Sequence, residues 1–277
     1  MKTTASDSFA TPDGRRSTLT QLARGAIGGL VTIEKAARLL GVTPKIATAR
    51  LRRLVAQGWL TRAQRGVYLI RPLEAGGPST ATTVEDPWVL AHELFAPCYI
   101  GGWSAAEHWE LTEQLFRSTF VVSAAARRRA SETRLATEFR VARVPPPRVE
   151  SVGEIWRGSI RMRVSDRERT IADGLMHPVW LGGMRHIVEM LRTYGQGTHF
   201  QPQGILGHLK TLDAGAGTKR LGFLAEHLWP AEKELVERAL ANRSSGIVKL
   251  DPTVADAGPV DSRWGLRINI DVEEGSV

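Results

Sequence analysis

The strongest restriction on the fold comes from residues 32–58, where a glycine and a proline separate two helical patterns. The apolar positions of the first pattern share one helix face, and they are Ile33, Ala36, Ala37 and Leu40. Gly41 follows and suits a turn, where a positive φ is commonly needed. Thr43 is a good N-cap, and Pro44 fits the first position of a helix. The sequence therefore predicts two short helices joined by a tight turn.

The second of these helices is expected to run from Pro44 to about Gln57, with Gly58 closing it. Four positions recur at helical spacing and are predicted to point inward: Ala47, Leu51, Leu54 and Val55. The predicted outward positions and their flanks are Lys45, Thr48, Ala49, Arg50, Arg52 and Arg53. Small residues beside long basic ones allow a helix to enter a major groove of DNA deeply.

A helix and a hairpin are predicted on either side of this pair. Ser17 can cap the earlier helix, whose apolar face is Leu19, Leu22, Ala23 and Ala26. A strand over residues 59–62, a turn over 63–66 and a strand over 67–70 form the hairpin. This order predicts a winged helix-turn-helix. Arg62 and Arg65 would then reach phosphates or the minor groove.

The positive charge of the chain lies in this same segment. Residues 1–73 hold 13 Lys and Arg against 3 Asp and Glu, whereas residues 74–277 hold 24 against 26. No carboxylate occurs from Lys35 to Leu73. A solvated surface normally mixes both signs, so this segment is expected to meet a polyanion such as double-stranded DNA. The predicted contact residues are Thr43, Lys45, Thr48, Arg50, Arg52, Arg53, Arg62 and Arg65.

Length and composition set the remaining bounds. The chain has 277 residues, 42% of them hydrophobic and 24% charged, which is typical of globular proteins of about two domains. No apolar run approaches the ~18 residues of a membrane span, and residues 1–16 contain no secretory leader pattern. The single cysteine, Cys98, excludes an internal disulfide and a cysteine-rich zinc site. We therefore expect a cytoplasmic protein without a metal or cofactor.

The predicted organisation is α+β, with an N-terminal winged helix-turn-helix followed by a larger mixed α+β domain. We expect a flexible tail over residues 1–16, the winged helix over 17–73, a linker over 74–84 and the C-terminal domain over 85–277. The C-terminal domain should be helical from about 184 to 243. Ser104 is a predicted helix cap, and Ser165 with Glu168 forms a predicted capping box.

Several C-terminal segments resemble the AbiEi-type antitoxin family. They occur in the family's order and spacing, and they span 99–114, 164–173, 178–183, 219–226, 250–252 and 264–269. The most distinctive run is Gly101-Gly102-Trp103-Ser104. The positions that the resemblance singles out are Gly102, Trp103, Ser104, His108, Asp166, Glu168, Arg169, Asp173 and Arg220.

The resemblance implies a role in a bacterial two-gene toxin–antitoxin or abortive-infection system. Its winged helix would repress the chain's own operon, with a pair of chains on inverted repeats of the promoter. Its C-terminal domain would counteract a nucleotidyltransferase-like toxin. Whether the two proteins touch directly stays open.

No motif predicts catalysis. None of the seven histidines occurs in an HExxH motif. Only six residues separate Gly158-Ser159 from Asp166, too few for the helix that a nucleotidyltransferase site needs between its glycine turn and its acids. Residues 215–220 lack the order of a phosphate-binding loop and are predicted to connect two helices. We therefore expect no enzyme.

Two other functions remain as alternatives. The chain would be a transcription factor with a ligand-sensing C-terminal domain if its tryptophans lined a pocket rather than a core. Those tryptophans are Trp88, Trp103, Trp109 and Trp156. It would be a nuclease fused to a winged helix if Asp166, Glu168 and Asp173 bound Mg²⁺, although no Asp…Glu-x-Lys pattern follows them.

Overall fold

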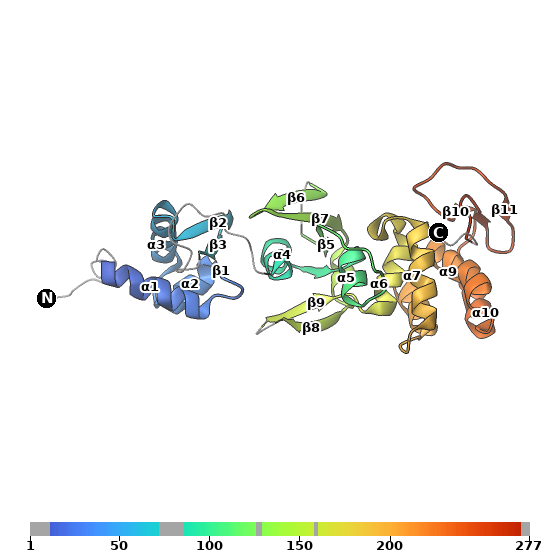
Figure 1. Ribbon diagram of the computed structural model, residues 1–277, viewed down its shortest axis with the longest axis horizontal. Coiled ribbons are helices and arrows are strands. Elements are labelled where there is room, and N and C mark those ends of the chain that lie inside the picture. Colours follow the sequence, from blue (N-terminus) through green and yellow to red (C-terminus); the bar gives the residue numbers. More distant parts are fainter. Residues whose placement is uncertain (1–11, 72–85, 126–128, 158–159, 273–277) are drawn as a thin grey trace. The chain divides into compact units, whose positions relative to one another are not determined.

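The protein is described here by a computed structural model covering residues 12–71, 86–125, 129–157 and 160–272 (Figure 1). Its mixture of helices and sheets confirms the predicted α+β class. The chain divides into two compact units, the first being Met1–Ala96, Ser131–Phe139 and Trp156–Arg161, and the second the remainder. The predicted linker, most of the predicted tail and the pair Gly158-Ser159 lie outside the described residues.

The first unit contains the helices and the hairpin that the sequence predicts. Its elements are α1 (Pro12–Gly25), β1 (Leu30–Thr32), α2 (Ile33–Leu40), α3 (Pro44–Ala56), β2 (Leu60–Gln64), β3 (Val67–Ile70) and α4 (Pro87–Phe95). The three strands form one sheet in the order β1-β3-β2. The sequence did not predict β1, a strand too short to show an alternating pattern, in which Leu30 pairs with Leu69.

The predicted turn and caps of α2 and α3 are confirmed. The Thr32 hydroxyl accepts a hydrogen bond from the Lys35 amide, and the Thr43 hydroxyl accepts one from the Ile46 amide. Gly41 ends α2 with φ +60°, a conformation that favours glycine. The predicted cap at Ser17 is wrong, because α1 already begins at Pro12 and Ser17 lies inside it.

The core of the first unit lies between the three N-terminal helices and the sheet. Ala47, Leu51 and Leu54 of α3 are fully buried there, as predicted, and Val55 is half-buried. They pack in one apolar cluster with Leu19 and Leu22 of α1 and with α2. The predicted inward position Ala23 is exposed instead. Burial of one face of α3 leaves its opposite face to the solvent.

A six-stranded sheet follows, in the order β6-β7-β5-β4-β9-β8. Its strands are β4 (Cys98–Ile100), β5 (Thr119–Ser123), β6 (Ser131–Arg134), β7 (Thr137–Arg143), β8 (Gly153–Arg157) and β9 (Ile160–Val164). The central strand β4 runs antiparallel to β5 and parallel to β9. Cys98 in this strand is buried.

Helices make up most of the second unit (Figure 1). They are α5 (Gly102–His108), α6 (Arg167–Met176), α7 (Met184–Gln196), α8 (Pro202–Thr211), α9 (Gly215–Leu228) and α10 (Lys233–Ala241), with 3-10 turns η1 (Pro146–Val149) and η2 (Pro178–Leu181). A small sheet is formed by β10 (Val248–Lys249), β11 (Val260–Asp261) and β12 (Leu266–Arg267). The helix α6 packs against α5, α7, α8 and α9. No helix among the described residues is both long and apolar enough to cross a membrane.

Two predicted serine caps are wrong. The helix α5 starts at Gly102, so Ser104 lies inside it and its hydroxyl accepts the Phe120 amide of β5 at 2.8 Å. The cap of α6 is Asp166, whose carboxylate accepts the Arg169 amide at 2.7 Å. Ser165 is instead fully buried, with its hydroxyl 2.8 Å from that of Thr170. A carboxylate one residue closer to the helix therefore replaces the predicted capping box.

The structure also corrects a prediction about a loop. Residues 215–218 form the first turn of α9 rather than a helix connection, and Gly215 and Gly217 allow close approach of Ser244 and Leu209. The 3-10 turn η1 begins inside the run Pro145-Pro146-Pro147, at Pro146, because proline is tolerated in the first turn of a helix.

Trp264 anchors the end of the chain in the core of the second unit. It is fully buried, and its indole nitrogen donates to Glu226 Oε2 at 2.6 Å. Its ring lies against the backbone of α9 at Gly222, where a Cβ would come within 2.0 Å of the indole. Gly222 is therefore required by close packing.

Replacement of Gly222 by Ala is expected to lower the free energy of unfolding by roughly 1–3 kcal/mol, because the added methyl group has no room. Gly207 of α8 is the matched control, since nothing lies within 4 Å of a Cβ built there. Gly207→Ala should raise the stability by up to about 1 kcal/mol through helix propensity. Urea denaturation of both variants measures the difference. Equal effects of the two substitutions would contradict the packing described for Trp264.

Candidate functional site

The outer face of α3 carries exposed cationic side chains. Lys45, Arg52 and Arg53 are exposed and Arg50 is half-buried. The half-buried Thr48 donates its hydroxyl hydrogen to the Pro44 carbonyl oxygen at 2.7 Å, which keeps this side chain close to the helix. The first turn of α3 contains no acidic residue, and its N-cap is the neutral Thr43. The sequence prediction of a basic outward face is confirmed in position.

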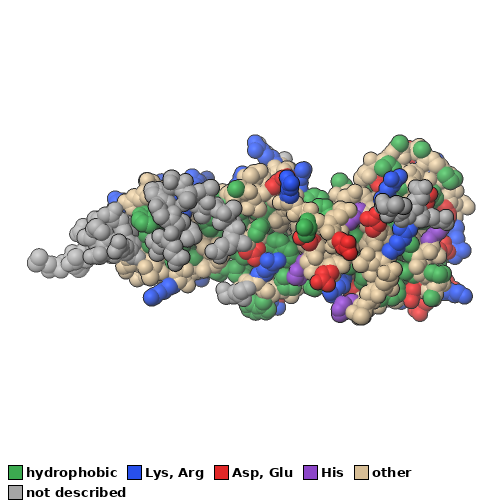
Figure 2. All heavy atoms as spheres, in the orientation of Figure 1, with side chains coloured by type: hydrophobic (Ala, Val, Ile, Leu, Met, Phe, Trp, Pro, Cys, Tyr) green, Lys and Arg blue, Asp and Glu red, His purple; other side chains and the backbone are tan. Residues whose placement is uncertain are grey.

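Part of this positive charge has no carboxylate partner in the described part of the chain. Among the described residues, no ion pair joins Lys45, Arg52 or Arg65 to an acidic side chain. Over α5 to α10, in contrast, Figure 2 shows acidic and basic side chains mixed on the visible face. The N-terminal helices therefore present charge that a polyanion can neutralise.

The hairpin supplies two more cations. Arg62 is exposed, and its Nε donates to the Gln64 carbonyl oxygen at 3.2 Å, across an irregularity in the pairing of β2 with β3. Arg65 is exposed in the turn that follows, and Gly66 closes this turn with φ +89°. The strand β2 extends to Gln64, farther than predicted, so the turn is shorter.

Two exposed apolar residues of the N-terminal segment were not predicted from the sequence. Ile46 is 46% exposed in the first turn of α3, and Trp59 is 39% exposed just before β2. The sequence could have indicated the exposure of Ile46, because this residue does not fall at the helical spacing of the buried positions Ala47, Leu51 and Leu54. An exposed aliphatic side chain beside basic ones is suited to contact with a thymine methyl group.

The motif at Gly102-Trp103-Ser104 organises aromatic packing in the second unit. Gly102 has φ +50°, and a Cβ there would lie 2.7 Å from both the Phe120 ring and the Trp180 carbonyl oxygen. The Trp103 indole nitrogen donates to the Ser118 carbonyl oxygen at 2.8 Å. His108 ends α5 as an exposed side chain, with its ring 4.6 Å from that of Trp109.

A second motif forms a buried charge cluster. Arg169 Nε donates to Asp173 Oδ1 at 2.9 Å, and the Tyr99 hydroxyl donates to Asp173 Oδ2 at 2.7 Å. The other guanidinium nitrogens of Arg169 donate to the carbonyl oxygens of Arg148 and Ser151. Burial alone would lower the pKa of Arg169, but Asp173 and Tyr99 outweigh it and raise that pKa. Arg169 therefore stays charged while connecting β4, η1 and α6.

Asp166 and Glu168 point to different partners and do not form a metal site. Asp166 lies 3.3 Å from His208 Nε2; burial tends to raise its pKa, but the His208 contact and the Arg169 amide lower it. Glu168 accepts the Tyr194 hydroxyl at 2.7 Å. Among the described residues, no group of three or more His, Cys, Asp or Glu is arranged to hold a metal ion.

Arg220 is buried in a cage of backbone carbonyls. It donates to the carbonyl oxygens of Leu175, Lys249 and Leu250 at 2.7–2.9 Å. Burial lowers the pKa of Arg220 to about 10, although Asp251 opposes this effect, so it remains charged at neutral pH. Asp251 also accepts the Met184 amide that begins α7. Arg169, Asp173 and Arg220 are thus inaccessible to a partner in this conformation, and their role as site residues stays a prediction.

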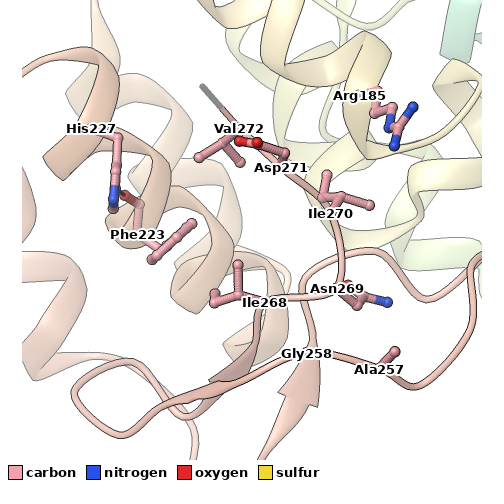
Figure 3. Close-up of a pocket in the computed structure, with 10 residues that line it drawn as sticks. All are labelled: Arg185, Phe223, His227, Ala257, Gly258, Ile268, Asn269, Ile270, Asp271 and Val272. Atoms are coloured by element: carbon pink, nitrogen blue, oxygen red, sulfur yellow. Dashed lines mark hydrogen bonds between the residues drawn. The ribbon is translucent and has the colours of Figure 1, made fainter. Parts of the chain in front are cut away.

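A shallow cavity of about 580 Å³ lies between α7, α9 and the segment 268–272 (Figure 3). Two of the polar side chains that line it are used within the fold, while Arg185 is exposed. Both amide hydrogens of Asn269 are donated to the carbonyl oxygens of Asp251 and Ala255. His227 Nδ1 lies 2.8 Å from the Phe223 carbonyl oxygen of its own helix. This cavity therefore offers few groups for a ligand.

The buried cluster predicts an order of stability losses. Tyr99→Phe should lower the free energy of unfolding by about 1–2 kcal/mol, because Asp173 loses one donor. Asp173→Ala should cost roughly 3–5 kcal/mol, because Arg169 is left buried without its partner. Glu234→Ala removes an exposed pair with Arg238 at the same helical spacing and should cost less than about 0.5 kcal/mol. Chemical denaturation gives all three values, and an equal loss for Asp173→Ala and Glu234→Ala would contradict the cluster's contribution.

Comparison with known proteins finds a solved structure of similar fold. The whole chain is similar to the solved structure "Crystal structure of RV2827C protein from Mycobacterium tuberculosis", with a TM-score of 0.61 and 17% identity over 92% of this chain and 91% of that chain. This likeness shows the fold. No protein in the curated set matches the sequence.

Residues 17–71 match the family described as "Transcriptional regulator, AbiEi antitoxin". The matched range covers α2, the turn, α3 and the hairpin, together with most of α1. The resemblance noted in the C-terminal segments of the sequence is therefore joined by an independent match at the N-terminus. This segment is therefore similar to the AbiEi antitoxin transcriptional regulators.

Proposed function

We propose that this protein is a DNA-binding antitoxin that represses its own operon and counteracts a nucleotidyltransferase-like toxin. The observation that carries the proposal is the exposed, carboxylate-free basic face of α3 within the segment that matches the AbiEi regulators. The order of α2, turn, α3 and hairpin supports a winged helix-turn-helix.

In this proposal α3 is the recognition helix and enters the major groove. Phosphates or base edges are contacted by Lys45, Arg52 and Arg53. The small side chain of Ala49 lets the helix approach the groove closely. Thr43 and Pro44 place the positive end of the helix dipole at the start of this face. Arg62 and Arg65 of the hairpin contact the neighbouring backbone. With about six phosphate contacts, the logarithm of the binding constant would fall with a slope near −5 against the logarithm of the salt concentration.

The antitoxin activity is proposed to reside in the second unit. Its support is the resemblance of the segments around Trp103, Arg169 and Arg220 to the AbiEi-type antitoxins. Because these segments are largely buried, they define the shape of the domain, and contact with another protein would use the exposed residues that they support.

Charge reversal on α3 tests the DNA-binding half. The double variant Arg52→Glu and Arg53→Glu should lose promoter binding by at least about 100-fold, because two phosphate contacts become repulsive. Both side chains are exposed, so the fold should persist. A mobility shift with a fragment of its own promoter measures binding. The matched control reverses Arg129 and Arg185, two exposed arginines outside this face, and should bind normally. Unchanged binding by the α3 variant would overturn the interface.

Co-expression tests the antitoxin half. The full chain should relieve the growth arrest caused by a nucleotidyltransferase encoded beside it, and residues 86–277 should suffice if the work is divided between the units. Persistent arrest despite expression of the full chain would refute this role. The α3 variant should still rescue growth, which separates neutralisation from repression. Gel filtration of the two co-expressed proteins then shows whether they form a stable complex.

A further inference from the structure

An aromatic pocket in the second unit has no place in the function proposed above. Its volume is about 690 Å³, within the range of small-molecule sites. It lies where α5, the residues before β5, the strand β7 and η2 meet. The pocket is distant in sequence from α3, and all of its lining residues belong to one compact unit.

The apolar part of the pocket is a chain of ring contacts. Trp103 stacks on Phe116 with ring centres 5.3 Å apart and meets Phe120 edge-on at 4.7 Å. Phe120 lies 5.6 Å from Trp180, which stacks on His177 at 4.3 Å. Phe120 is buried, while Trp103, Phe116 and Trp180 remain partly exposed. Partly exposed rings supply surfaces on which a planar ligand can stack.

The polar part of the pocket is cationic. Arg117, Arg140 and Arg143 line it, and no Asp or Glu is among the described residues that do so. Arg117 and Arg143 are exposed, and no ion pair joins either of them to an acidic side chain among the described residues. This local excess stands out because residues 74–277 carry a net negative charge. Several guanidinium groups at one rim suit a phosphate better than a single carboxylate.

Two of the segments that resemble the antitoxin family, 99–114 and 178–183, contribute to this pocket. Gly102 lets the Phe120 ring and the Trp180 backbone approach α5, since a Cβ would clash with both. Ser104 accepts the Phe120 amide and so fixes the start of β5. Trp103 is the one of the four tryptophans considered in the sequence that lines the pocket. Trp88 and Trp109 instead lie beside Arg157 and Arg167, and Trp156 is 70% exposed.

We propose that this pocket binds a nucleotide, with the base on the exposed rings of Trp103 and Trp180 and the phosphate at Arg117 and Arg143. Stacking on aromatic side chains accepts any base, so the shape of the pocket would decide which base is preferred. His177 is held neutral because burial, Arg148 and Arg220 all lower its pKa, which leaves it able to donate to or accept from a base edge. The site is independent of DNA binding by α3.

Isothermal titration of the full chain with AMP, GMP, CMP and UMP tests the assignment. At least one should bind with a Kd below about 1 mM, and its uncharged nucleoside should bind at least tenfold more weakly. Indole-3-acetate and tripolyphosphate probe the aromatic and anionic halves separately, and each should bind more weakly than the nucleotide. No binding by any nucleotide, or tighter binding by indole-3-acetate, would overturn the proposal.

Variants locate the binding. The double variant Arg117→Ala and Arg143→Ala should bind the preferred nucleotide about tenfold more weakly or worse, because charge-assisted hydrogen bonds to the phosphate are lost. Arg185→Ala, an exposed arginine outside the pocket, should leave the affinity unchanged. The double variant Arg52→Glu and Arg53→Glu should also leave it unchanged, and a loss there would place the nucleotide on the DNA-binding face and refute the pocket. Thermal unfolding checks that each variant is folded.

Discussion

The second unit depends on a buried arginine that never reaches the solvent. Arg169 joins the central strand β4, the turn η1 and the helix α6 by hydrogen bonds to Asp173, to Tyr99 and to two backbone carbonyls. A buried charge is tolerated only when every donor is satisfied, so these elements must take up one arrangement together. Arg220 of α9 connects elements in the same way, by hydrogen bonds to the carbonyl oxygens of Leu175 in α6 and Lys249 in β10. The charged motif residues Arg169, Asp173 and Arg220 therefore hold the elements of this unit together.

The N-terminal helices follow the opposite logic, because Lys45 and Arg52 lie exposed without an ion pair to a carboxylate among the described residues. These helices are held by apolar burial at Leu22, Leu51 and Leu54, so the basic side chains carry little of the packing and stay available. Mutual repulsion of these cations lowers the stability of the N-terminal segment. A bound polyanion would remove this repulsion. Arginine thus serves as an internal connector in the second unit, whereas the exposed arginines of α3 are contact residues only in the function proposed above.

Much of the fold was predictable from local signals. Thr43, Pro44 and Gly41 fixed α3 and its turn, because caps and positive φ depend on adjacent residues. The wrong caps arose where two candidates competed, as at Ser165 and Asp166, since only tertiary burial decides between them. The aromatic pocket was not predictable. Its rings come from residues 103, 116, 120, 177 and 180, and no periodic pattern links positions that only the folded backbone brings together.

The insertion of Trp264 into the helical core has a consequence for synthesis on the ribosome. The core of the second unit also includes Leu250, Leu266, Ile270 and Val272, so it is complete only once residues 250–272 have been translated. The N-terminal helices bury their own core and need none of these residues. The N-terminal helices can therefore complete their core during synthesis before residues 250–272 emerge, whereas the core of the second unit cannot.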